Sequence, residues 1–189
     1  SCSIPFRLAV LAGSRHRFAG FAPNEKGARQ RMPEFKPPRP GEIAIDLPLD
    51  TDAGLRFIGR IRSPWATPAD CPKNSRERRE IGTVEIDHRY AAGLKDLEGF
   101  SHAILLYWLD RARRDLIVQC PSHLGAPRGV FALRSPVRPN PIGLAVVEIV
   151  AIEGAHITVR NIDCADMTPL IDIKPYFASI DAVPDARRP

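Results

Sequence analysis

The chain has 189 residues, of which 44% are apolar and 26% are charged, a composition typical of one compact globular domain. No apolar stretch approaches the roughly 18 residues that a transmembrane helix needs, which excludes an integral membrane protein. The net charge of +5 resides entirely in residues 1–31, which hold six basic side chains and one acid, while the remainder is balanced. The positive net charge is therefore no indication that the folded domain binds nucleic acid.

Residues 1–52 are predicted to be an N-terminal extension that acts as a tether and not as a domain. They begin with an arginine-rich, acid-poor stretch, and its apolar patch at residues 8–12 is too short for a secretion signal. Met32 leaves two alternatives: residues 1–31 belong to the native protein, or translation begins at Met32 and they belong to an extended gene model. The proline-rich residues 33–41 are expected to run extended.

The folded domain is expected at residues 53–180, followed by a C-terminal tail at 181–189. Proline accounts for 19 residues, about twice its usual ~5% share, and it interrupts helices and central strands. Apolar and β-branched runs predict strands at 55–61, 82–87, 101–109, 130–133, 144–152 and 156–162, the last two forming a hairpin through residues 153–155. The run 101–109 is apolar enough for a strand buried on both faces, and only 91–100 and 112–118 leave room for short helices. The predicted fold class is mainly β: a single β-barrel-like domain with short helices and long loops.

A proline-rich segment at residues 133–144 interrupts this strand pattern, and we call it the proline segment. Its three prolines within six residues leave the backbone little freedom. Arg134, Ser135, Arg138 and Asn140 stand on this rigid track, which suits a ligand site that is ordered before the ligand arrives. The alternative is a stiff crossover between strands with no ligand.

A second unusual segment, residues 162–176, carries three acids and one lysine among apolar residues directly after a predicted strand. Charges in such surroundings must be paired or hydrogen-bonded. Asp172 and Lys174 are equally well explained as a structural ion pair.

Several common site motifs are absent from the sequence. No Gly-x-Gly-x-x-Gly, phosphate-loop or Gly-x-Ser-x-Gly pattern occurs, so a Rossmann, P-loop or α/β-hydrolase enzyme finds no support. The four cysteines and five histidines show no metal-ligand spacing. A reduced, metal-free, cytoplasmic protein is the simplest expectation.

Four segments in order resemble the signature motifs of the TsaA-like, TrmO-type tRNA methyltransferases: residues 58–65, 97–102, 134–144 and 166–176. The resemblance implies a dimeric β-barrel that binds S-adenosylmethionine without a Rossmann fold. It also implies that the enzyme methylates N6 of N6-threonylcarbamoyladenosine beside the anticodon of threonine tRNA. We expect no membrane association and no metal.

The same resemblance assigns cofactor contacts residue by residue. Lys73 and Asn74 stand where the family has arginine and glutamine, and Met167 stands where it usually has glycine. The backbone at Met167 therefore either avoids positive φ or carries strain. The implied cofactor-binding residues are Pro72, Lys73, Asn74, Asp110, Arg111, Arg134, Leu144, Asp166, Thr168, Pro169 and Leu170.

Methyl transfer to an amide-like nitrogen requires a group that accepts its proton. Asp166 and Asp172 are the candidate bases, and Asn140 and Tyr176 are the candidates for orienting the acceptor. Tyr107 is expected in the core or in a dimer interface. Two rival functions remain open: a cofactor-binding barrel with a small-molecule or protein acceptor, and a non-catalytic cofactor sensor or RNA-binding module.

Overall fold

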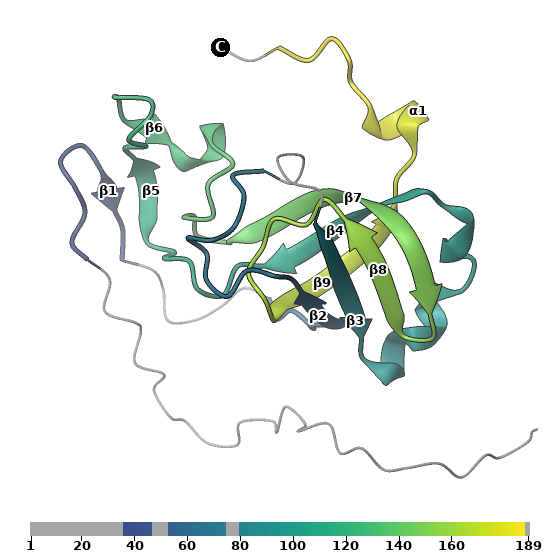
Figure 1. Ribbon diagram of the computed structural model, residues 1–189. Helices are drawn as coiled ribbons and strands as arrows, with labels where there is room; N and C mark the ends of the chain where they lie inside the picture. Colours follow the sequence, from purple (N-terminus) through teal and green to yellow (C-terminus); the bar gives the residue numbers. More distant parts are fainter. Residues whose placement is uncertain (1–35, 47–52, 75–79, 188–189) are drawn as a thin grey trace, which may run out of the picture. The chain divides into compact units, whose positions relative to one another are not determined.

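The computed structural model describes residues 36–46, 53–74 and 80–187, which belong to one compact unit. Six of its strands close into an antiparallel barrel in the order β2-β3-β8-β7-β4-β9 (Figure 1). This confirms the predicted β-barrel. No helix among the described residues has the length and apolar character that a membrane span needs. The barrel strands are β2 (Gly59–Arg62), β3 (Ile81–Ile86), β4 (His102–Trp108), β7 (Ile142–Glu153), β8 (His156–Arg160) and β9 (Thr168–Pro175).

The barrel interior is filled by alternate side chains from each strand, as the two-residue period of a strand requires. In β4 the inward residues Ala103, Leu105 and Tyr107 are buried, while the residues between them are half-buried. The expectation that this strand is buried on both faces was therefore wrong, because β4 forms a barrel wall with only one face toward the core. The hairpin of β7 and β8 is confirmed, with Gly154 at φ +60 in its turn.

Strand β9 closes the barrel, although its residues were not among the predicted strands. It pairs with β2 on one side and β4 on the other. Thr168 and Leu170 point into the barrel and are buried, whereas Asp172 and Lys174 remain partly exposed and form an ion pair at 2.9 Å. The two charged residues thus lie outside the core. They form the structural ion pair that the sequence analysis gave as one explanation of their presence.

Two other local predictions were wrong in secondary structure. The expected helix at 112–118 overlaps strand β5 (Leu116–Gln119), and the expected strand at 130–133 overlaps the 3₁₀ helix η3 (Val130–Ala132). Short helices do lie at 91–100, as two 3₁₀ helices, η1 (His88–Leu94) and η2 (Leu97–Gly99). Strand β5 owes its conformation to partners far away in sequence, which a local pattern cannot reveal. The α-helix α1 (Ala178–Asp181) follows the barrel.

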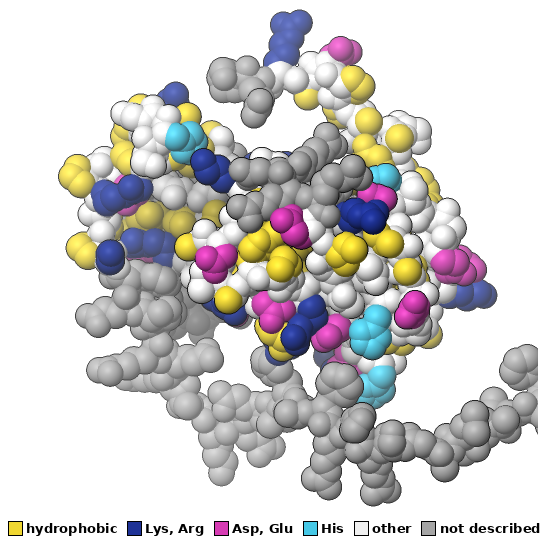
Figure 2. Space-filling view, viewed as in Figure 1, with side chains coloured by type: hydrophobic (Ala, Val, Ile, Leu, Met, Phe, Trp, Pro, Cys, Tyr) yellow, Lys and Arg dark blue, Asp and Glu magenta, His cyan; other side chains and the backbone are white. Residues whose placement is uncertain are grey.

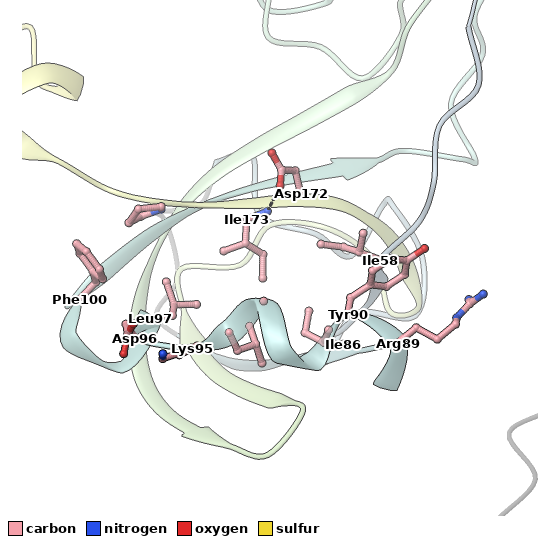
Figure 3. A pocket seen from close by; sticks show the side chains of 13 residues that line it. Ile58, Ile86, Arg89, Tyr90, Lys95, Asp96, Leu97, Phe100, Asp172 and Ile173 are labelled. Carbon is pink, nitrogen blue, oxygen red and sulfur yellow. Dashed lines mark hydrogen bonds between the residues drawn. The ribbon is translucent and has the colours of Figure 1, made fainter. Parts of the chain in front are cut away.

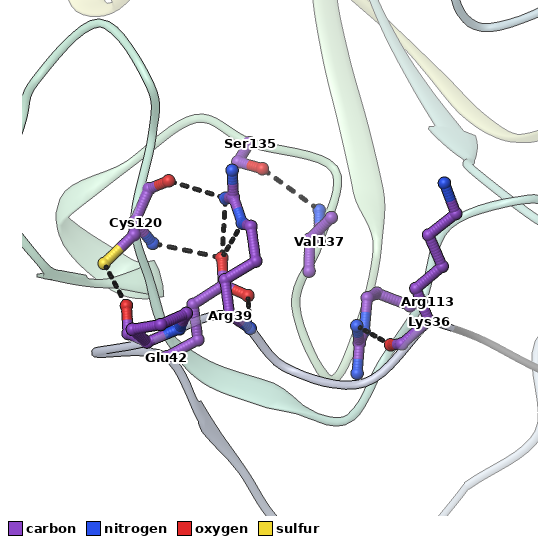
Figure 4. A network of polar contacts seen from close by, with 8 residues as sticks. Lys36, Arg39, Glu42, Arg113, Cys120, Ser135 and Val137 are labelled. Carbon is purple, nitrogen blue, oxygen red and sulfur yellow. Dashed lines mark hydrogen bonds and ion pairs between the residues drawn. The ribbon is translucent and has the colours of Figure 1, made fainter.

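A small sheet beside the barrel has the order β1-β5-β6, with β1 at Ile43–Ala44 and β6 at Arg128–Gly129. Strand β1 thus pairs part of the expected tether with β5, while residues 1–35 and 47–52 lie outside the described residues. Glu42 accepts hydrogen bonds from the Arg39 side chain and from the Cys120 backbone N–H (Figure 4). These bonds to Arg39 lower the pKa of the Glu42 carboxyl to about 2.

The Tyr107 ring packs closely against the backbone of Gly143. The two residues are direct cross-strand partners on β4 and β7. A Cβ added at Gly143 would lie 2.0 Å from the Tyr107 ring. Only glycine therefore leaves room for the ring at this position.

We predict that Gly143→Ala lowers the free energy of unfolding by about 1–3 kcal/mol, because the added methyl group overpacks the barrel. Urea denaturation measures this change. Gly129→Ala is the matched control, since a Cβ at Gly129 meets nothing within 4 Å. Equal stability of the two variants would contradict the close approach.

Candidate functional site

A pocket of about 1110 Å³ opens at the Tyr107 end of β4, and we call it the main pocket. Four chain segments far apart in sequence line it: residues 68–74, 107–113, 134–144 and 163–168. These segments lie in the loop after β2, at the end of β4, in the proline segment and just before β9. The volume slightly exceeds the range of about 300–1,000 Å³ that is typical of small-molecule sites.

The proline segment is held in place by arginine side chains that donate to backbone carbonyls. Arg138 donates from Nε to the Ser135 carbonyl at 3.0 Å and from Nη2 to the carbonyls of Val130 and Leu133. Arg114 donates to the Pro139 carbonyl at 2.7 Å. This arrangement supports a rigid, pre-ordered segment, and it gives Arg138 a structural role that composition alone did not reveal.

Arg111 connects two of the lining segments. Its Nη1 donates to the Ala66 carbonyl at 2.8 Å, and its Nη2 donates to the Asp166 carbonyl at 3.2 Å. The guanidinium therefore fixes the loop after β2 against the segment that precedes β9. Arg111 both lines the pocket and sets the distance between its sides.

Tyr107 and Asp163 form a polar pair at the base of the main pocket. The Tyr107 hydroxyl donates to Asp163 Oδ1, and both residues line the pocket. Tyr107 is only 3% exposed, so burial raises its pKa well above the ordinary value, and the charge of Asp163 raises it further. The phenol therefore stays protonated and continues to donate to the carboxylate.

The charged groups on the main pocket are mixed in sign and predominantly basic. Five basic residues and two acids line it. One of the basic residues, Arg113, is already paired with Asp115 at 2.8 Å. The pocket can thus hold a ligand that carries both anionic and cationic groups. The charged lining residues are Lys73, Arg111, Arg113, Arg134, Arg138, Asp110 and Asp163.

Most of the implied cofactor-binding residues lie together on the main pocket. Eight of them line it: Pro72, Lys73, Asn74, Asp110, Arg111, Arg134, Leu144 and Thr168. Leu170 is fully buried in the barrel core, and Pro169 stands opposite Arg60 in the β2–β9 ladder. Neither of these two lines the pocket.

Asp166 lies directly beyond the pocket-lining residue Ala165 without lining the pocket itself. Its Oδ1 accepts the Ser63 backbone N–H at 3.1 Å and lies 3.2 Å from Arg62 Nε. These contacts fasten the carboxylate to the end of β2. Asn140 belongs to the proline segment, and its carbonyl accepts the Ile142 N–H at 2.8 Å.

Asp172 and Tyr176 are not brought to the main pocket within this chain. Asp172 lines a second pocket of about 550 Å³, and Figure 3 shows it on the opposite side of β9 from Ile173. The Tyr176 N–H donates to the His102 carbonyl at the far end of β4 from Tyr107. Tyr107 is five positions along the strand from His102, a distance of about 17 Å at the usual rise.

Sequence reasoning did not single out Tyr107, Asp163 or Cys71 as pocket residues. The signal for Asp163 was present, because it is the first acid after strand β8. Tyr107 carried no such signal, since an inward tyrosine near a strand end looks like any core residue. No group of three or more candidate metal ligands occurs in the part of the chain that the structure describes.

Comparison with known proteins relates this architecture to a family. The model of the tRNA-methyltransferase O N-terminal domain matches residues 60–182. The probable S-adenosyl-L-methionine-binding protein VirR of Rhizobium radiobacter is 44% identical over 137 residues, which cover 72% of this chain and 78% of that protein. The mouse tRNA (adenine(37)-N6)-methyltransferase is 40% identical over 92 residues, covering 47% of this chain and 21% of that protein.

A solved structure shares the fold as well. The crystal structure of TrmO from Pseudomonas aeruginosa superposes with a TM-score of 0.58 at 34% sequence identity. The match covers 76% of this chain and 63% of that chain. The chain therefore spans less than two thirds of the solved protein and about a fifth of the mouse protein.

Met167, next to the pocket-lining Thr168, adopts φ +67. The alternative that its backbone avoids positive φ was therefore wrong, and strain at Met167 stays a prediction. The conformation is held by the Met167 N–H, which donates to the Ile61 carbonyl at 2.8 Å, and by Arg60, which donates to the Met167 carbonyl at 3.2 Å.

We predict that Met167→Gly is more stable than Met167→Ala by about 1 kcal/mol, because a Cβ disfavours the left-handed region. Both variants lack the contacts of the methionine side chain, so the difference in stability between them reports on the Cβ alone. At Lys95, where φ is −53, the order reverses, and alanine is the more stable by about 0.5–1 kcal/mol. Thermal unfolding of the four variants checks both orders, and the same order at both positions would refute strain at Met167.

Proposed function

Because the chain belongs to the family of the tRNA-methyltransferase O N-terminal domain, we propose that it is an S-adenosylmethionine-dependent methyltransferase acting on N6 of an adenosine in tRNA. The finer proposal is that the acceptor is N6-threonylcarbamoyladenosine beside the anticodon of threonine tRNA. The main pocket carries this proposal, since it gathers eight implied cofactor contacts from four separate segments.

The main pocket suits the chemical groups of S-adenosylmethionine. The cofactor combines a carboxylate with a positively charged amine and sulfonium, and the pocket offers both signs of charge within one volume. Arg134 and Lys73 can receive the carboxylate, and Asp110 and Asp163 can receive the cationic groups. Apolar lining from Leu109, Ile142 and Leu144 suits the adenine ring.

The chain's main catalytic task is to position the acceptor, because the cofactor's sulfonium is already an activated methyl donor. Holding a donor and a nucleophile in line supplies about 7–11 kcal/mol of the barrier. When bound, the cofactor would supply the methyl group and leave as a neutral thioether, and the acceptor nitrogen would give up its proton to a carboxylate of this chain. The rigid proline segment and the Arg111 bridge are the parts of this chain that keep the geometry constant.

A carboxylate must accept that proton, and Asp166 and Asp172 stay the proposed bases, with Asn140 and Tyr176 orienting the acceptor. The pocket adds Asp110 and Asp163 as candidates, because both line it. We also propose a homodimer, since Asp172 and Tyr176 approach a main pocket only if a second chain supplies them.

We predict that the protein transfers labelled methyl groups from S-adenosylmethionine to tRNA from cells that lack the endogenous activity. Nucleoside mass spectrometry of the digest should show the label on N6-threonylcarbamoyladenosine. Transfer should weaken steeply with salt, because RNA binding through phosphate contacts releases counterions.

The matched control is tRNA that lacks the threonylcarbamoyl group, which should remain unlabelled. Label on unmodified adenosine would support tRNA methylation but refute N6-threonylcarbamoyladenosine as the acceptor. Cofactor binding without any labelled nucleoside would refute tRNA methylation.

We predict that replacing the catalytic base lowers kcat by about 10²–10⁴-fold while leaving cofactor affinity within a fewfold of wild type. The variants for this test are Asp166→Asn and Asp172→Asn, and Asp185→Asn in the exposed tail is the control. Asp110→Asn and Asp163→Asn should weaken cofactor binding as well, because these two carboxylates can also receive the cationic groups of the cofactor. Kinetics and calorimetric cofactor binding separate loss of the base from loss of the site. Normal turnover by both the Asp166 and Asp172 variants would refute their proposed role.

A further inference from the structure

Phe131 is 83% exposed, the highest value among the exposed large hydrophobic side chains of the described residues. It lies in the middle of η3, between the fully buried Val130 and the exposed Ala132. An aromatic ring presented to water forgoes a large gain from burial, because a phenylalanine side chain contributes about 1.5–3 kcal/mol when buried.

The backbone that carries Phe131 is held on both sides. The Leu133 N–H donates to the Val130 carbonyl at 3.2 Å, closing the turn. Arg138 donates to the carbonyls of both Val130 and Leu133. The ring therefore stands on an ordered turn, so a partner that stacks on it meets a platform whose backbone is already ordered.

The chain around Phe131 is strongly basic. Residues 111–144 contain six arginines and a single acid, Asp115, which is itself paired with Arg113. The rest of residues 32–189 carries an excess of acids. On the face shown in Figure 2, Lys and Arg side chains gather over β1, β5 and β6, and most Asp and Glu side chains lie over the barrel. The balanced total charge thus conceals a local excess of positive charge.

Phe131 is also connected to the main pocket. Helix η3 directly precedes the proline segment, and Arg138, which holds the η3 turn, lines the pocket itself. A polynucleotide that places one base in the main pocket would leave its neighbouring nucleotides near this turn.

We propose that Phe131 stacks on an unpaired nucleobase of the substrate RNA, beside the nucleotide that enters the main pocket. The inference rests on the proposed tRNA function and names a residue that positions the RNA. Single-stranded RNA is recognised by aromatic stacking together with cationic contacts to its phosphates, and both elements are present here.

The surroundings of the ring favour a nucleobase over an apolar protein surface. Its exposed neighbours in the chain, Pro127 to Gly129, include the cation Arg128. A subunit interface typically places its aromatic anchors within a larger apolar core. Arg128, three residues before Phe131 in the chain, can meet a phosphate close to a stacked base.

The test measures binding of the full chain to a labelled RNA hairpin with an unpaired seven-nucleotide loop, by fluorescence anisotropy at fixed salt. Phe131→Ala should bind the hairpin about tenfold to a hundredfold more weakly than wild type, because a stacked base is lost. Phe131→Trp should restore binding, since it keeps a π-face. Binding to a fully paired duplex of equal charge should not change, because its bases are already stacked.

Three controls make the result decisive. Ile180→Ala, at a side chain that is 73% exposed in α1, should leave hairpin binding unchanged. Cofactor affinity should be the same in wild type and Phe131→Ala. Sedimentation should show the same oligomeric state in both. Equal loss on hairpin and duplex, unchanged hairpin binding, or an altered oligomeric state in Phe131→Ala would each overturn the proposal.

The two proposals fail separately in this design. If wild type binds the hairpin in a Phe131-dependent manner but methylates no tRNA, the methylation proposal is refuted and the stacking platform stands. If wild type methylates tRNA and Phe131→Ala has an unchanged KM for tRNA, the stacking proposal is refuted and the function stands.

Discussion

The packing of Tyr107 against Gly143 is the constraint on which both the barrel and the main pocket depend. The ring occupies the space that any other residue at 143 would need, so it fixes how closely β4 and β7 approach. Its hydroxyl then reaches beyond the core to Asp163 and determines where that carboxylate lies. One side chain thereby couples core packing to the charge at the base of the pocket, and a shift in the core would move the site.

The rest of the site is assembled by arginines that bind backbone carbonyls. Arg111 and Arg138 each contact at least two carbonyls from segments that carry no regular hydrogen-bond ladder. Long loops leave many carbonyls without a partner, and guanidinium groups supply donors in a planar, fixed arrangement. The loop-rich end of the barrel is thus ordered by charged hydrogen bonds, whereas the barrel wall is ordered by strand pairing.

The barrel class and the β7–β8 hairpin were predictable, because their apolar alternation is local and their turn carries glycine. Strands β5 and β9 were not, since β5 depends on β1 and β6, and the charges of Asp172 and Lys174 hid the period of β9. Eight pocket residues followed from the resemblance of ordered motifs. The roles of Tyr107 and Asp163 depend on a contact between residues far apart in sequence, which no local pattern contains.

The closure of the barrel has a consequence for how the chain is made. Strand β2 pairs with β9, so Gly59 has no partner on that side until Leu170 has been synthesised. Strand β4 also lacks one neighbour until β9 is present. During synthesis on the ribosome, two strand edges therefore stay open until the last barrel strand emerges. Open edges recruit other strands, and such distant pairing forms slowly. Over that interval these two edges can pair with other chains, and a chain that ends before residue 168 lacks the strand that closes the barrel.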